Sequence, residues 1–281
     1  MSTYVLDHHR EAERLERQAN TVQCSYQREL QNLSLASYAT VLDAGCGSGV
    51  VARYLAANDA TVNVVGCDVS ESRVQHARHL AQGIPNVTFQ VDDLADSRFA
   101  SQTFDAIVCR YVLEHLDQPT LQGTIAEFWR LLKPTGLLYI IDVDGIFLNL
   151  YPQSSFIADI HRRLVNLTSL DMSIGRKIPS LLVAGGLSQV DWDIETSVCK
   201  DEMMQTEIVL MRERFQHFMP CLAQCIGSAD MAQRYCDEYL HTMAQPGAVL
   251  FYNKFIVTGR KPAPVSRVPA PQGIKTLRGY R

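Results

Sequence analysis

The chain has 281 residues, of which 47% are hydrophobic and 20% are charged, so it holds enough apolar material for a substantial core. Its formal net charge is -4, although residues 261–281 contain bases and no acid. Residues 1–260 are therefore more acidic than the total indicates. Such a body is a poor electrostatic match for a nucleic-acid backbone, which excludes that class of partner.

Membrane insertion and secretion are also not expected. Residues 1–16 carry charges where a secretory signal would have its apolar middle, and no segment reaches the roughly 18 to 20 apolar residues that cross a bilayer. The eight cysteines are therefore expected to be reduced thiols in a cytoplasmic protein. Cys221 and Cys225 could share a metal on one helix face, but small buried side chains are the simpler interpretation.

The predicted elements alternate along the first half of the chain. Residues 1–37 have apolar side chains at three- and four-residue steps, which predicts a helical N-terminal cap. Short apolar runs then alternate with helical patterns, which is typical of a doubly wound α/β fold with helices on both faces of a parallel sheet. The runs predict strands at 40–44, 61–68, 87–91, 104–109 and 137–142, with helices at 50–57, 70–82 and up to 132.

Beyond residue 145 the alternation gives way to mostly helical patterns, at about 146–180 and 200–246. Two further strands are predicted, at 190–197 and 251–258. We expect one domain over 38–260, with the two helical insertions packed over the carboxyl edge of the sheet, where open α/β sheets bind ligands. The tail, 261–281, is rich in proline and bases and is not expected to form a core.

A glycine motif, DAGCGSG at 43–49, follows the first predicted strand. Such glycines let the backbone turn sharply and approach a ligand at the start of the next helix. A dinucleotide fingerprint would need glycine at position 50, which is Val50, and Asp43 would repel a pyrophosphate. Asp68, at the end of the next strand, is where an acid binds ribose hydroxyls. The pattern favours a cationic nucleoside without phosphate, and S-adenosylmethionine fits this description.

The segment 38–145 resembles the class I S-adenosylmethionine-dependent methyltransferases, and specifically their small-molecule branch. The resemblance implies a Rossmann-like sheet of seven strands, mostly parallel with an antiparallel last strand, and with a helical cap and lid. The motifs occur in the expected order, as DAGCGSG (43–49), VGCDVS (65–70), QVDDL (90–94), FDAIVCR (104–110) with VLEHL (112–116), and RLLKPTG (130–136), where Thr135 replaces the usual glycine.

The resemblance also implies roles for single residues. The glycine motif, with Gly45, Cys46, Gly47 and Gly49, would hold the methionine part of the cofactor. The remaining implied contacts are Asp43 with the ammonium group, Asp68 with the ribose, Val69 and Leu94 with the adenine, Asp92 or Asp93 with its exocyclic amine, and Arg110 with the methionine chain.

The N-terminal helix resembles the cap of this branch. Arg14 and Gln18, one turn apart, would then reach the methionine carboxylate, and Tyr4 would close over the site. The alternative is a charged helix face that is only solvated.

Methyl transfer needs little from the protein beyond alignment, because the cofactor supplies the electrophile. His115 is the candidate general base if the acceptor must lose a proton. The alternative is that Glu114 and His115 only cap and pack their helix. Asp142 and Asp144 could hold a cation, but no Asp-Asn partner of a catechol-type site is evident, so no metal is predicted.

The acceptor is predicted to be an apolar or aromatic metabolite, such as a natural product. This rests on aromatic residues and methionines in the two insertions, of which we expect about a third to line a pocket. The alternatives are a catalytically inactive cofactor-binding module and, less favoured, a nicotinamide-dependent oxidoreductase. A homodimer is compatible with the sequence. The candidate lining residues are Phe147, Tyr151, Phe156, Met203, Met204, Met211, Phe215, Phe218, Met219, Tyr235 and Tyr239.

Overall fold

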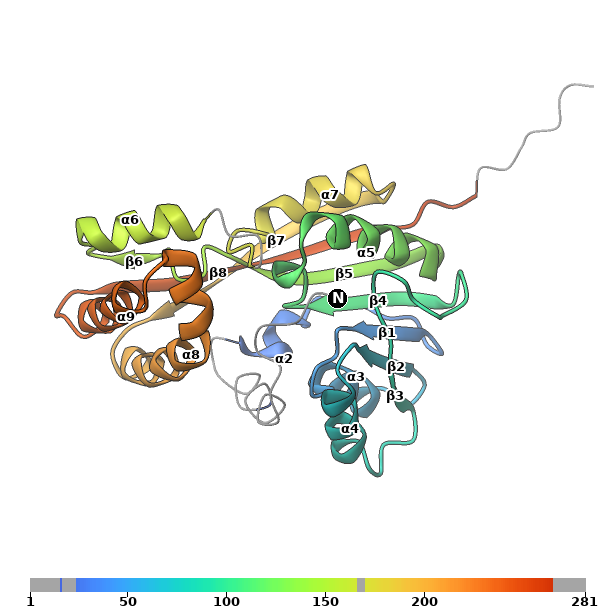
Figure 1. Cartoon of the computed structure of the whole chain (residues 1–281). Coiled ribbons are helices and arrows are strands. Elements are labelled where there is room, and N and C mark those ends of the chain that lie inside the picture. The colour runs from blue at the N-terminus through green and yellow to red at the C-terminus, as the bar shows by residue number, and fades with distance from the viewer. Residues whose placement is uncertain (1–15, 17–23, 166–169, 265–281) are drawn as a thin grey trace, which may run out of the picture.

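The computed structural model describes residues 16, 24–165 and 170–264 (Figure 1). Its centre is a mixed sheet in the order β3-β2-β1-β4-β5-β8-β6, in which β7 pairs with the other edge of β8. The strands are β1 (Thr40–Ala44), β2 (Asn63–Asp68), β3 (Val87–Val91), β4 (Phe104–Arg110), β5 (Leu132–Asp144), β6 (Leu150–Tyr151), β7 (Ser188–Cys199) and β8 (Val249–Arg260).

The helices follow the predicted alternation as far as β5. Within the described residues, no helix is long and apolar enough to cross a bilayer. The helices are α2 (Tyr26–Glu29), α3 (Val50–Asn58), α4 (Glu71–Leu80), α5 (Gln118–Leu131), α6 (Ser155–Leu164), α7 (Ile178–Ala184), α8 (Glu202–Ile226) and α9 (Ala229–Met243), with short 3₁₀ turns η2 (Leu113–His115) and η3 (Gly175–Lys177).

The sheet confirms the predicted doubly wound α/β fold. Strands β1 to β5 pair in parallel, whereas β8 is antiparallel to both β5 and β7. All seven predicted strands are present, and the two-residue β6 is added to them. The last strand is antiparallel because the chain re-enters the sheet from the lid side instead of crossing over it.

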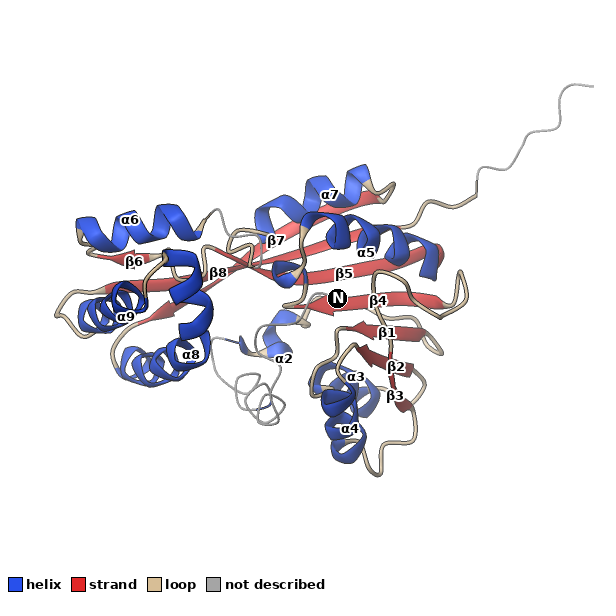
Figure 2. Ribbon diagram, in the orientation of Figure 1, coloured by secondary structure: helices blue, strands red, loops and turns tan. Residues whose placement is uncertain are grey.

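Alternate residues of each strand point to opposite faces, so each face has its own core. Leu42 and Ile107 pack in the cluster that includes α5 and α7, whereas Val41 and Val108 pack in the cluster that includes α3 and α4. Figure 2 shows these helix pairs on opposite faces of the sheet. The two layers fix the carboxyl ends of the strands, where the loops of the site begin.

A third cluster lies beside the sheet and is formed by α6, α8 and α9, which we call the lid. These helices gather around β6 and the first half of β8 in Figure 1. Phe215 of α8 packs against Tyr235 and Tyr239 of α9, with ring centroids 5.8 and 5.4 Å apart. By contrast, α7 packs on the sheet near α5, and it begins where the first predicted helical insertion, about 146–180, ends.

The motif at 130–136, predicted as a turn before the fifth strand, lies mostly inside β5 in the structure. β5 begins at Leu132, which pairs with Phe104, and the register shifts before Leu137 pairs with Ala106. Thr135 has φ +67°, a left-handed conformation, and its N–H donates to Lys261 O at 2.9 Å. The irregular start of β5 is therefore fixed by backbone hydrogen bonds to the end of the described chain.

Candidate active site

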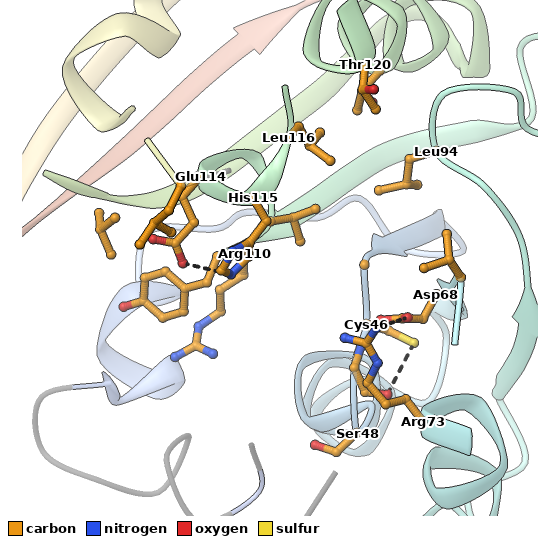
Figure 3. A pocket seen from close by; sticks show the side chains of 18 of the residues that line it. Cys46, Ser48, Asp68, Arg73, Leu94, Arg110, Glu114, His115, Leu116 and Thr120 are labelled. Atoms are coloured by element: carbon orange, nitrogen blue, oxygen red, sulfur yellow. Dashed lines mark hydrogen bonds and ion pairs between the residues drawn. The ribbon is translucent and has the colours of Figure 1, made fainter. Parts of the chain in front are cut away.

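A cavity of about 970 Å³ lies at the carboxyl ends of the parallel strands and extends to the lid. Pockets for single ligands run from about 300 to 1,000 Å³, so this one has room for a nucleoside and a second small molecule. Figure 3 shows Asp68, Cys46 and Arg73 on one side of the cavity, with Glu114 and His115 on the other. In the first group, Cys46 and Asp68 come from the ends of β1 and β2 and Arg73 from the start of α4, whereas the second group follows the end of β4.

The glycine motif forms the floor of the first side. Gly45 has φ +74° and Gly47 has φ +53°. A Cβ atom at Gly45 would lie 2.4 Å from Val112 Cγ2, so only glycine fits there. The Gly45 and Cys46 N–H groups donate to Cys67 O at 2.9 and 2.8 Å, which pulls the loop against β2. Gly45, Cys46 and Gly47 all line the cavity.

Two members of the predicted set lie behind this loop and not on the cavity wall. Gly49 is the left-handed N-cap of α3, and a Cβ atom there would lie 2.6 Å from Phe89. Asp43 Oδ2 accepts a hydrogen bond from Ala52 N–H at 3.0 Å, and burial raises the pKa of Asp43 to about 7. Both residues are explained by the packing of α3 against the sheet.

Asp68 is held rigidly at the end of β2. Its Oδ2 accepts from Gly47 N–H at 3.0 Å and its Oδ1 from Ser70 N–H at 2.9 Å. Arg73 Nη2 lies 3.3 Å from the same Oδ1. A carboxylate has about four acceptor positions, so Asp68 can still accept from a ligand hydroxyl. Asp68, Arg73 and the exposed Val69 line the cavity.

Asp92 and Asp93 differ in how they are engaged. Asp92 is buried and accepts from Ser97 Oγ at 2.6 Å and from Arg98 Nε at 3.2 Å. Asp93 is exposed and accepts from Ala95 N–H at 2.9 Å. Asp92 therefore shapes its own loop, and Asp93 keeps its carboxylate open to solvent. Both line the cavity together with Leu94.

Arg110 belongs to a buried network that the sequence pattern does not reveal. Its Nε donates to Glu29 Oε2 at 2.6 Å. Glu29 is 0% exposed and also accepts from Tyr111 Oη at 2.6 Å and Lys254 Nζ at 3.0 Å. The Arg110 Nη2 donates to Cys24 O at 2.7 Å. Glu29 was missed because it lies among other charged residues of the N-terminal region, with no local motif around it.

Glu114 and His115 form a pair on η2 that faces the cavity. His115 Nε2 lies 3.3 Å from Glu114 Oε1, and both residues line the cavity. Asp142, at the end of β5, supports this turn because its Oδ2 accepts from Leu113 N–H at 3.0 Å. Burial raises the pKa of Asp142 to about 7.

The remaining candidates for metal binding have other contacts. Asp144 is buried and makes two hydrogen bonds to Arg176, at 2.6 and 2.7 Å. Cys221 and Cys225 lie with their sulfur atoms 3.9 Å apart on α8. Within the described ranges, no group of three or more His, Cys, Asp or Glu side chains could hold a metal ion.

The lid supplies the far wall of the cavity. Of the predicted aromatic and methionine candidates, Phe147 and Phe218 line it, whereas Phe215 packs in the lid core. Arg214 and Tyr252 also line it and were not predicted. The sequence signal that could have identified Arg214 is a charged residue within the apolar periodic pattern of α8.

Three predicted N-terminal contacts, Tyr4, Arg14 and Gln18, lie outside the described residues. Glu16, from the same segment, accepts hydrogen bonds from Ser48 Oγ at 2.9 Å and from Arg53 Nη2 at 2.7 Å. Because Ser48 lines the cavity, Glu16 lies beside the glycine loop.

Comparison with known proteins matches residues 41–136 to a family model described as a methyltransferase domain. A ubiquinone biosynthesis O-methyltransferase of Coxiella burnetii is 36% identical over 108 residues, 38% of this chain and 44% of that protein. An uncharacterised methyltransferase of Synechocystis is 29% identical over 176 residues, 59% of this chain and 80% of that protein. The chain thus spans less than half the length of the first curated relatives it matches.

Solved structures agree in fold. A phosphoethanolamine N-methyltransferase of Haemonchus contortus, solved with S-adenosylmethionine, has a TM-score of 0.59 and 17% identity, covering 91% of this chain and 57% of that one. A [4+2]-cyclase has a TM-score of 0.58 and 21% identity, covering 84% and 79%. At these identities the likeness concerns the fold alone.

Proposed function

Because residues 41–136 match a methyltransferase domain, we propose that this chain is a class I S-adenosylmethionine-dependent methyltransferase that transfers a methyl group to a small molecule with apolar or aromatic parts. The observation that carries the proposal is that one cavity joins the glycine motif to the lid. Gly45 and Asp68 line one end, and Phe147 and Phe218 line the other. Relatives named for ubiquinone biosynthesis and for phosphoethanolamine support a small-molecule acceptor.

The residues at the first end fit S-adenosylmethionine. Because the loop has no room for a Cβ atom at Gly45, its backbone would lie close to the methionine part of the cofactor. Asp68 is fixed by two backbone N–H groups and would accept from the ribose hydroxyls. Asp93 would accept from the adenine amine, since Asp92 already contacts Ser97 and Arg98.

When bound, the cofactor supplies a methyl group on a sulfonium, so no protein nucleophile is required. Burial raises the pKa of Cys46 well above its ordinary value, which keeps the nearby thiol neutral and unreactive. The protein aligns the acceptor and excludes water. These tasks fall to the lid and to the buried walls of the cavity.

His115 would accept the proton of a hydroxyl or amine acceptor. If Glu114 accepts the Nε2 proton across the 3.3 Å contact, Nδ1 is left as the basic nitrogen. Asp142 would keep η2 in place beneath this pair through its bond to Leu113 N–H. An acceptor that reacts without losing a proton would not need His115.

A second use of the fold is binding of the cofactor without methyl transfer. The observation in its favour is the structural likeness to a protein named a [4+2]-cyclase. The two alternatives differ in product. Methyl transfer converts S-adenosylmethionine to S-adenosylhomocysteine when a metabolite extract is added, and a module that only binds leaves it intact.

Asp68 gives the direct test of the cofactor assignment. We expect Asp68→Asn to weaken S-adenosylhomocysteine binding at least about tenfold in calorimetry, because hydrogen bonds to a charged group contribute about 1.5 kcal/mol or more. Asp191→Asn, an exposed carboxylate on β7, is the matched control and should bind as the wild type does. Unchanged affinity in Asp68→Asn, or tight binding of NAD with none of S-adenosylhomocysteine, would contradict the proposal.

A further inference from the structure

A buried arginine lies in the lid half of the cavity, among side chains that are otherwise mostly apolar. Arg214 of α8 lines the cavity near Phe147 and Phe218. Only 15% of its side chain is exposed. Removing a guanidinium from water costs several kcal/mol unless its surroundings compensate, so its presence here requires a partner.

Glu207 supplies that partner from behind. It is 0% exposed and its Oε1 accepts from Arg214 Nη1. Tyr252 Oη donates to the same Oε1 at 2.7 Å. This arrangement fixes the orientation of the guanidinium, because Glu207 cannot move without losing two hydrogen bonds.

The contact with Glu207 uses only part of what Arg214 offers. A guanidinium carries five N–H donors in a planar fork. Among residues 16, 24–165 and 170–264, only Glu207 provides a hydrogen-bond acceptor for Arg214. The other N–H groups are therefore left to whatever fills the cavity, where apolar neighbours such as Ile146 and Leu170 reduce competition from water.

Other charged groups in this half are paired among themselves. Arg110 and Lys254 both contact Glu29, and Lys254 also lies 3.6 Å from Glu195. Glu114 lies beside His115. None of these carboxylates forms an ion pair with Arg214, so among the described ion pairs its positive charge is balanced by Glu207 alone.

We propose that the methyl acceptor carries a carboxylate on an apolar or aromatic body, and that Arg214 binds this carboxylate. The proposal rests on the methyltransferase function above and specifies its substrate class. A planar carboxylate matches the guanidinium fork with two parallel hydrogen bonds. Phe147 and Phe218 would contact the apolar body, and Glu207 acts as a positioning residue for Arg214.

The test uses the whole protein loaded with S-adenosylhomocysteine and two isosteric probes, 2-naphthoate and 2-naphthamide. We expect the wild type to bind 2-naphthoate about tenfold more tightly than 2-naphthamide in calorimetry, because a charge-assisted pair is lost in the amide. The double variant Glu207→Gln with Arg214→Met avoids an unpaired buried carboxylate and should lose this preference. Arg212→Met, an exposed arginine on the same helix, should keep it.

Equal binding of the two probes to the wild type, or binding of neither, overturns the proposal, as does a preference retained in the double variant. A parallel loss of S-adenosylhomocysteine affinity in the double variant also overturns it, because Arg214 would then serve the cofactor carboxylate. Melting curves check that the variant is folded. Failure of the methyltransferase function is recognised separately, by absence of S-adenosylhomocysteine binding to the unmodified protein.

Discussion

Glu29 shows how much one buried carboxylate can organise. It joins α2 to β4 through Arg110 and to β8 through Lys254, which lie 81 and 225 positions further along the sequence. Burial alone would raise its pKa, but Arg110 and Lys254 together hold the pKa of Glu29 below its ordinary value of 4.5. The carboxylate is therefore ionised at neutral pH and is the counter-charge that Arg110 and Lys254 share on the cavity wall.

We expect Glu29→Gln to lower the free energy of unfolding by about 3 kcal/mol at pH 7, because Arg110 loses its ion pair and Lys254 keeps only the longer contact with Glu195. A folded-state pKa below the unfolded one means that this contribution is present above pH 4.5 and is lost as the pH falls through the folded value. The gap between variant and wild type should therefore shrink in acid, as measured by urea titration at several pH values.

Glu71→Gln is the control for this change. Glu71 is 61% exposed at its side chain and lies 3.7 Å from Arg78, so its loss should change stability by less than about 0.5 kcal/mol. A pH-independent gap for Glu29→Gln would contradict the assignment of an ionised, paired carboxylate.

Residues of the site were predictable where their neighbours in sequence determine their position. Gly45, Gly47 and Asp68 lie in short motifs whose conformation is set by a strand and the following helix. Glu29 and Arg214 were not, because their roles depend on contacts that only the folded chain creates. Asp43 and Gly49 stand in the same glycine motif, yet they support α3 from behind.

At the level of elements, the turn into β5 carries local strain. Thr135 is a β-branched residue with φ +67°, a region that glycine adopts without steric cost. Its N–H donates to Lys261 O, and its carbonyl accepts from Arg260 Nη1 at 3.0 Å. These hydrogen bonds of the Thr135 backbone hold the turn. The β-branched side chain therefore raises the conformational energy of the turn without making a contact that the fold requires.

Thr135→Gly is expected to raise the free energy of unfolding by up to about 1 kcal/mol, since it removes the left-handed penalty and keeps both backbone bonds. Thermal or urea denaturation measures the change. Thr88→Gly, at an exposed and extended position of β3, should instead destabilise by about 1 kcal/mol. A loss of stability in Thr135→Gly would show that the side chain has a role of its own.

The strands were the most predictable elements, because short apolar runs between turn residues have few other interpretations. β1 was predicted with the bounds it has, Thr40–Ala44. The helices after β5 were harder. Apolar periodicity indicates a buried face but not its neighbour, so it did not predict that α6 packs with α8 and α9 in the lid.

For the whole molecule, the three hydrophobic clusters imply parts that differ in stability. Two clusters share the sheet, whereas the third lies in the lid and meets the sheet mainly through β6 and β8. The residues proposed to hold the cofactor come from the sheet side, and Arg214 and Phe218 come from the lid. Opening of the lid can thus be separated from loss of the cofactor site.

Phe215→Ala tests this division. Phe215 is 3% exposed, and its removal should cost the lid about 3 kcal/mol. Hydrogen exchange in α8 and α9 should become faster while β1 and β4 stay protected, and S-adenosylhomocysteine affinity should stay within about threefold. Phe128→Ala, on the buried face of α5, is the comparison and should accelerate exchange in the sheet. Equal acceleration everywhere in Phe215→Ala would mean that lid and sheet unfold as one unit.

The pairing of β7 with β8 bears on how such a protein can diversify. Cys199, the last residue of β7, lies opposite Leu250 near the start of β8. Adjacent strands are about 4.8 Å apart, so the chain leaves and re-enters the sheet at nearly the same position, and 200–248 is a closed excursion that includes α8 and α9. Exchanging that excursion between relatives would leave the sheet ladder intact. Acceptor preference could then change by exchange of this one segment, while the sheet residues proposed to hold the cofactor stay the same.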